Sequence, residues 1–147
     1  MADLHINDFY KDVAKVFVRL YNSFPQKIIL YVDEISGEDQ PDEFGLHSER
    51  YLAGFSTMVW LAEQGYLRFD TTIKQEALDQ AVLTQKGFLL LSSLAEFNFG
   101  GEEEQDDGLP PSVLSQHKSN INQLRHCLKS GSSIFIEQCV SYLLNKS

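Results

Sequence analysis

Two short stretches decide the fold of this 147-residue chain: TMVWLAEQGYLR at residues 57–68 and AVLTQKG at residues 81–87. The first predicts the end of a helix, because apolar residues recur at helical spacing and Gly65 can adopt the left-handed conformation that ends helices. Ser48 is the predicted N-cap of this helix. The second stretch predicts a strand that ends at Leu83 and a helix capped by Thr84.

The residues between these stretches predict a hairpin. Residues 66–71 alternate apolar and polar side chains, which indicates a strand, and residues 78–83 are its predicted partner. We place the hairpin tip at residues 72–77. Gly54 lies inside the preceding helix, where glycine costs about 1 kcal/mol relative to alanine. It therefore marks either a break between two helices or a close helix contact.

The N-terminal residues predict a long amphipathic helix and a short strand. Apolar side chains recur every three or four positions from Ile6 to Phe24, which indicates a helix over about residues 7–23 that Pro25 ends. Residues 27–32 are mostly β-branched or aromatic and predict a strand. Residues 33–45 carry six acidic side chains, two glycines and one proline. They predict a solvated loop, with a short helical turn near residues 32–35.

A charged segment rich in Gly and Pro divides the chain. Residues 99–111 predict an acidic linker between a domain at 1–98 and a C-terminal helical hairpin at 112–147. Because two short amphipathic helices are not stable alone in water, the hairpin must pack on another surface. We predict a homodimer contact, with docking on the chain's own first helix as the alternative. The predicted contact residues follow coiled-coil spacing: Leu114, His117, Ile121, Leu124 and Leu128.

The order helix, strand, loop, helix, strand, turn, strand, helix resembles the winged helix-turn-helix domain. LxxxGYLR at residues 61–68 looks like the end of the family's recognition helix and the first wing strand, and LTxxG at residues 83–87 looks like the end of the second wing strand, as in MarR-like and PadR-like regulators. In this interpretation Leu83 fills the core, Thr84 caps the next helix and Gly87 lets that helix approach the sheet. The resemblance covers about residues 6–95 and implies an α+β fold with a two-stranded wing.

The resemblance also implies a partner, double-stranded DNA, and a role in transcriptional regulation. In the family, the recognition helix enters the major groove and the wing contacts the backbone or the minor groove. The candidate DNA contacts at the matching positions are Arg50, Ser56, Thr57, Arg68 and Lys74. However, the sequence lacks the basic stripe of a DNA-binding face. The alternative is a winged helix that acts as a protein-interaction or assembly module through an acidic surface, in which case these cations are ordinary solvated charges.

The distribution of charge weighs against DNA. The net charge of -9 comes from 21 acidic and 12 basic side chains. Residues 1–98 contain 15 acidic and 8 basic side chains, and residues 99–110 contain five acidic and no basic ones. Residues 111–147 contain four basic side chains and one acidic one. An acidic body repels nucleic acid at long range, because phosphate binding depends on Lys and Arg.

The sequence contains no motif for catalysis or for a bound metal. It lacks a phosphate-binding Gly loop, HExxH and GxSxG, and its four histidines are scattered. The acidic cluster at residues 102–107 lacks the spaced ligands and fixed glycine of a calcium loop. We therefore expect no enzymatic activity, no catalytic residues, no metal and no cofactor. Cys127 and Cys139 fall on apolar helical faces, which predicts buried, reduced thiols.

The apolar runs are short. None reaches the roughly 20 residues that a membrane-spanning helix needs, and the N-terminus lacks a basic region followed by an apolar block. We therefore expect a cytoplasmic protein with no membrane partner.

Overall fold

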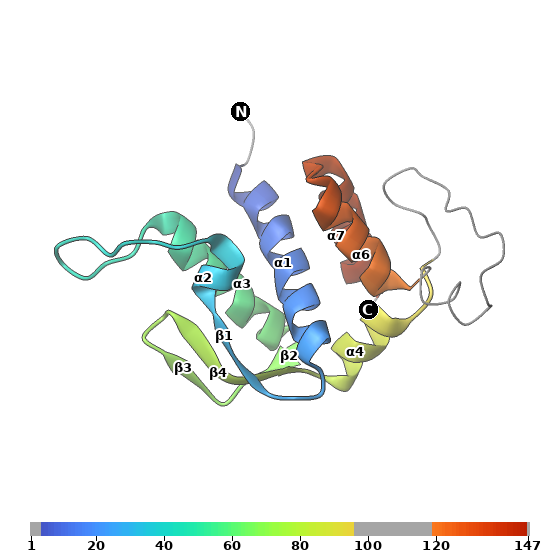
Figure 1. Ribbon diagram of the computed structural model, residues 1–147, viewed down its shortest axis with the longest axis horizontal. Helices are drawn as coiled ribbons and strands as arrows, with labels where there is room; N and C mark the ends of the chain where they lie inside the picture. Colours follow the sequence, from blue (N-terminus) through green and yellow to red (C-terminus); the bar gives the residue numbers. More distant parts are fainter. Residues whose placement is uncertain (1–3, 96–118, 147) are drawn as a thin grey trace.

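Helix α1 (Leu4–Ser23) runs through the middle of the computed structural model, between two groups of elements (Figure 1). The structure describes residues 4–95 and 119–146, which form six helices and four strands. The predicted α+β class is confirmed. The helix begins three residues before the predicted start and ends at Ser23, two residues before Pro25. Its buried residues lie on more than one side: Asp12, Val13, Ala14, Val16, Phe17 and Leu20.

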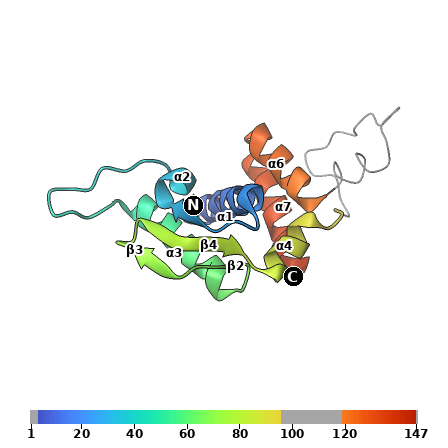
Figure 2. The same ribbon diagram turned by 60° about the horizontal axis from the view of Figure 1, so that its bottom comes forward.

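A small antiparallel sheet lies on one side of α1. Its central strand is β4 (Ala77–Leu83), which pairs with β1 (Ile28–Tyr31) on one edge. On the other edge it pairs with β2 (Leu67–Arg68) and β3 (Thr71–Ile73). Figure 2 shows β2, β3 and β4 side by side. The sheet therefore contains the predicted hairpin strands and the predicted strand at residues 27–32.

The hairpin differs from its prediction in one respect. The single strand predicted at residues 66–71 is two short strands, which pair with different parts of β4: β2 with Val82 and Leu83, and β3 with the segment from Ala77 to Asp79. Between these two parts Gln80 has a φ of 59°, a left-handed conformation that interrupts regular pairing. The turn itself is shorter than predicted, because residues 72, 73 and 77 are already paired.

Helices α2 (Val32–Ser36) and α3 (Glu49–Glu63) pack closely against each other. The Ser48 side chain accepts a 3.2 Å hydrogen bond from the backbone N–H of Tyr51, which confirms the predicted cap of α3. The helix continues through Gly54 without a break. A Cβ at Gly54 would lie 2.8 Å from Cβ of Ser36, so this glycine marks a close helix contact, the second of the two alternatives.

Helix α4 (Gln85–Ser92) begins as the LTxxG stretch predicts. The Thr84 hydroxyl accepts a 3.2 Å hydrogen bond from the backbone N–H of Gly87 and donates a hydrogen bond to the carbonyl of Gly65. A Cβ at Gly87 would lie 2.2 Å from the carbonyl oxygen of Tyr66, so only glycine lets α4 come this close to the start of the sheet. Leu83 is buried in the core.

Helices α6 (Asn120–Ser130) and α7 (Ser133–Lys146) lie on the other side of α1 (Figure 1). Ser119 caps α6, and Gly131, with a φ of 71°, ends it as predicted. The backbone N–H of Asn120 donates a 2.8 Å hydrogen bond to the carbonyl of Ser93, which ties the start of α6 to the end of α4. The predicted linker at residues 99–111 lies outside the described residues.

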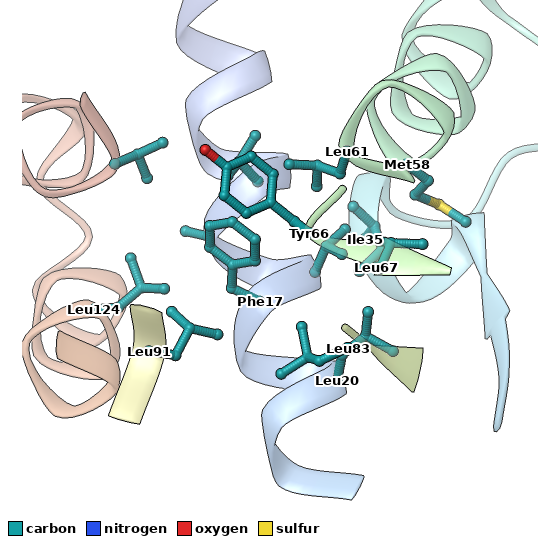
Figure 3. Close-up of a cluster of buried hydrophobic side chains, with 14 of the residues drawn as sticks. Phe17, Leu20, Ile35, Met58, Leu61, Tyr66, Leu67, Leu83, Leu91 and Leu124 are labelled. Atoms are coloured by element: carbon teal, nitrogen blue, oxygen red, sulfur yellow. The ribbon is translucent and has the colours of Figure 1, made fainter. Parts of the chain in front are cut away.

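One continuous apolar core joins both groups of elements. Figure 3 shows Phe17 of α1 between Tyr66 at the start of the sheet and Leu91 of α4, with Leu124 of α6 beyond. The rings of Phe17 and Tyr66 meet edge to face, with centroids 5.5 Å apart. The C-terminal helices therefore share their core with α1.

Candidate interaction surface

The exposed side of α3 is an acidic and aromatic stripe that contains no Lys or Arg. Its members recur at steps of four, three, four and three residues, and they are Glu49, Ala53, Ser56, Trp60 and Glu63. We call this set the α3 stripe. Trp60 is partly covered by Phe9 of α1, whose ring meets it edge to face at 5.3 Å. A duplex placed against this stripe would face two carboxylates.

Arg50 lies beside the α3 stripe and is held by α1. Its guanidinium donates two hydrogen bonds to the Asp12 carboxylate, at 2.8 and 2.7 Å, and its Nε lies 3.4 Å from Asp8. Burial raises the pKa of Asp12, while the guanidinium opposes that rise. The same pairing raises the pKa of Arg50. This predicted DNA contact is thus occupied by an ion pair within the chain.

The other two predicted contacts on α3 differ in exposure. Thr57 is buried, and its hydroxyl donates a 3.0 Å hydrogen bond to the carbonyl of Ala53 one turn earlier. Ser56 is exposed. Ser56 is therefore the one predicted contact within α3 whose side chain lies on the surface without a partner among the described residues.

Arg68 and Lys74 are exposed and belong to the hairpin rather than to α3. Lys74 occupies the turn, where its φ is 50°. Arg68 and Lys27 line an open depression of about 490 Å³, which Asp70 and Asp79 also line. The two carboxylates offset the two cations, so this depression is not a basic site. Within residues 4–95 and 119–146, neither Arg68 nor Lys74 forms an ion pair.

The loop at residues 37–48 contains a histidine that sequence reasoning did not select. His47 Nδ1 lies 3.0 Å from Asp39 Oδ2, and His47 Nε2 lies 2.7 Å from Glu76 Oε2 on the hairpin. Its ring stacks on Tyr51 of α3, with centroids 3.9 Å apart. We call His47, Asp39 and Glu76 the His47 clamp. Glu76 lies 29 residues from His47 in the sequence, so no local pattern could have brought them together.

The contacts around the His47 clamp shift the pKa values of His47, Asp39 and the neighbouring Tyr51. The hydrogen bond to Glu76, supported by that to Asp39, raises the pKa of His47 despite the opposing effect of burial. The backbone N–H of Ser48 donates a 2.9 Å hydrogen bond to Asp39 and lowers the pKa of that carboxyl. Burial, together with Asp33, raises the pKa of Tyr51 to about 12. The arrangement therefore favours the imidazolium form of His47, whose ring lies between the Asp39 and Glu76 side chains.

The predicted dimer stripe is described only in part. Leu114 and His117 lie outside the described residues. Ile121 and Leu124 are buried, and Leu128 packs against the same core, where α6 meets α1 and α4. Arg125 of α6 also donates hydrogen bonds to Asn22 and Asn122 and lies over the ring of Tyr21. The described part of the stripe thus docks on the chain's own first helix, the alternative stated from the sequence.

Within the described residues, the cysteines and acidic groups form no recognisable chemical centre. Cys127 and Cys139 are free and buried, as predicted for structural thiols. Across the described part of the chain, no three His, Cys, Asp or Glu side chains are arranged to hold a metal ion. None of the helices within residues 4–95 and 119–146 has the length and apolar character needed to cross a bilayer.

The chain matches no protein-family model, and comparisons with curated proteins and with solved structures gave no significant match.

Proposed function

We propose that this chain is a winged-helix protein-interaction module. Its acidic face, which includes the α3 stripe, binds a basic protein partner rather than duplex DNA. The element order supports the winged-helix assignment: α1, β1, α2 and α3 are followed by a hairpin, and β1 pairs with the last strand of that hairpin. In this assignment α3 corresponds to the recognition helix and β2 to β4 correspond to the wing.

The observation that carries the proposal is the composition of the α3 stripe. A helix that enters the major groove needs donors for phosphates and base edges, and Arg and Lys supply most of them. The α3 stripe instead presents the carboxylates of Glu49 and Glu63, and Trp60 lies between these two residues along the helix. Carboxylates on this face would repel the DNA phosphates, because both groups are negatively charged. A partly exposed Trp beside carboxylates instead suits a protein partner that carries Lys or Arg.

DNA binding remains the second candidate because of two side chains. Arg68 and Lys74 are exposed on the hairpin, where the wing of a winged helix contacts phosphates. Two such cations give weak binding that falls with salt, since each phosphate contact contributes about one unit to the salt slope.

A binding assay with a labelled random-sequence duplex at low salt separates the two candidates. We expect no binding by the natural chain, and measurable binding by a Glu49→Lys/Glu63→Lys variant, which shows that the assay detects a basic α3 stripe. Binding by the natural chain that is lost in an Arg68→Glu/Lys74→Glu variant would overturn the proposal in favour of DNA.

The protein partner is tested by photo-cross-linking in cells of the source organism. A photoreactive amino acid at Ser56, within the α3 stripe, should cross-link a basic protein. The matched control places it at Ile134, an exposed residue of α7. Equal cross-linking from both positions would contradict a specific role for α3.

A further inference from the structure

The loop at residues 37–48 projects from the body of the molecule (Figures 1 and 2). It carries two highly exposed apolar side chains. Phe44 is 78% exposed and Leu46 is 63% exposed. Phe44 is the most exposed of the large hydrophobic residues in the described part of the chain. Large apolar side chains displayed together at a projecting tip are a feature of interaction sites.

The tip is held in one shape by hydrogen bonds to a single residue. The Asp42 carboxylate oxygen Oδ1 accepts hydrogen bonds from the backbone N–H groups of Phe44 and Leu46, at 2.8 and 2.9 Å. The Asp42 backbone N–H donates to the carbonyl of Leu46 at 2.8 Å, and the N–H of Gly45 donates to the carbonyl of Asp42 at 2.9 Å. Gly45, with a φ of 79°, allows the reversal. This tip, residues 42–46, is therefore ordered by its own bonds.

The base of the loop is fixed to the body at two points. The His47 clamp joins it to Glu76 on the hairpin, and the stacking of His47 on Tyr51 joins it to α3. A loop fixed at both tip and base loses less conformational freedom on binding than an unrestrained one. The display of Phe44 and Leu46 is thus built before any partner arrives.

The charge around the tip defines what it can bind. Residues 38–43 contain four acidic side chains, Glu38, Asp39, Asp42 and Glu43, and no Lys or Arg. A partner must therefore offer an apolar pocket for an aromatic side chain and Lys or Arg at the rim of that pocket. An apolar pocket without cations would desolvate the exposed carboxylates of Glu38 and Glu43 without pairing them.

We propose that the tip at residues 42–46 is the anchor of the interaction, inserting Phe44 and Leu46 into an apolar pocket rimmed by basic residues on a protein partner. This inference rests on the proposed function, because it names the element through which the acidic face binds. The α3 stripe then forms the neighbouring part of the same interface.

The experiment uses the full chain and begins with photo-cross-linking from three positions. The photoreactive amino acid is placed at Phe44, at Ser56 and at the control position Ile134. The protein cross-linked from Phe44 is identified by mass spectrometry and purified, and its affinity is then measured by calorimetry. Phe44→Ser is expected to weaken binding at least about tenfold, as truncation of an aromatic anchor does.

Two further variants make the measurement specific. Ile134→Ser removes an equally large exposed apolar side chain from α7 and is expected to leave the affinity unchanged. Asp42→Ala keeps Phe44 but removes its turn acceptor, and it is expected to weaken binding severalfold through loss of the fixed shape. Rising salt should also weaken binding of the natural chain to the partner, because the contacts at the rim of the pocket are ionic. The exposed Phe44 and Ile134 side chains can be replaced without loss of the core, which circular dichroism verifies.

The outcomes separate this inference from the proposed function. One outcome is a protein that is cross-linked from position 56 and binds the Phe44→Ser variant as tightly as the natural chain. That result overturns the anchor and leaves the protein-interaction function standing. If neither position cross-links a protein and the natural chain binds duplex DNA, both are overturned. If the captured protein is a second copy of this chain, or is captured through a surface without cations, the proposed partner chemistry is overturned.

Discussion

Replacing Arg50 with leucine tests whether this residue belongs to the fold or to a binding surface. The Asp12 side chain is only 1% exposed, while that of Arg50 is 34% exposed. Arg50→Leu therefore leaves a buried carboxylate without its two charged hydrogen bonds. In contrast, Asp12→Leu leaves a guanidinium that still reaches water and Asp8. We expect the arginine substitution to be the more damaging of the two.

The size of the effect follows from this geometry. Removing one partner of a buried ion pair costs about 3–5 kcal/mol, and the partial exposure of Arg50 places this pair near the lower end, at about 3 kcal/mol. For a chain of this length that corresponds to a decrease in Tm of about 9 °C. Asp12→Leu should cost about 1–2 kcal/mol, and the double variant should recover to within about 1 kcal/mol of the natural chain, because no buried charge remains.

Urea unfolding of the four proteins gives the coupling energy directly. Burial already raises the pKa of Asp12, and removal of Arg50 raises it further. Protonation of the orphaned carboxyl then favours the folded state, so the deficit of Arg50→Leu should shrink as the pH falls through that raised value. Arg19→Leu is the control, since its partner Glu34 is 3.4 Å away and exposed. An Arg50→Leu variant as stable as the natural chain would refute this reasoning and release Arg50 for a ligand.

Three other predictions test the remaining contacts. Gly87→Ala places a methyl group against the backbone carbonyl of Tyr66 and should cost about 3 kcal/mol in thermal unfolding. Gly54→Ala meets the side chains of Ser36 and Val32 and gains helix propensity, so its cost should be smaller, about 1–2 kcal/mol; equal losses would contradict this difference. Because the pKa of His47 is raised in the folded state, the clamp stabilises the fold fully below about pH 6.5 and loses this effect as the pH rises through the raised value. Between about pH 6 and pH 9, Tm should therefore fall more in the natural chain than in His47→Gln. Parallel curves of Tm against pH would show that the clamp does not titrate. Leu124→Ala should cost about 2–5 kcal/mol without changing the molar mass in light scattering, and a change from dimer to monomer would instead restore the dimer contact.

Local sequence signals predicted much of the fold because each acts within a few residues. Thr84 and Gly87 are three residues apart, and their roles as cap and close-approach glycine follow from side-chain chemistry and size alone. Ser48 and Gly131 likewise mark a helix start and a helix end. The split of the strand predicted at residues 66–71 could not be predicted in this way, since it depends on the left-handed Gln80 in the opposite strand.

The candidate surface was harder to predict because its decisive contacts are distant in sequence. From the sequence alone Arg50 is a free cation. Only the fold brings it next to Asp12 of α1, which is 38 residues away in the sequence. The composition of the acidic loop predicts a solvated segment, and only the fold brings His47 into contact with Glu76. Nothing in this composition indicates that Phe44 and Leu46 are exposed rather than buried. The amphipathic stripe of α6 shows an apolar face, but its spacing does not state whether α1 or a second chain covers it.

The position of α1 between two groups of elements bears on how the protein opens. Apolar side chains of α1 belong to the single core that includes both Leu61 of α3 and Leu124 of α6. Detaching α6 and α7 would expose that side of α1 to water, so such partial opening should cost the free energy of that apolar burial. The backbone amides of α1 should then be among the slowest to exchange hydrogen with solvent, and a fragment that ends after residue 98 would lack part of the surface that keeps them closed.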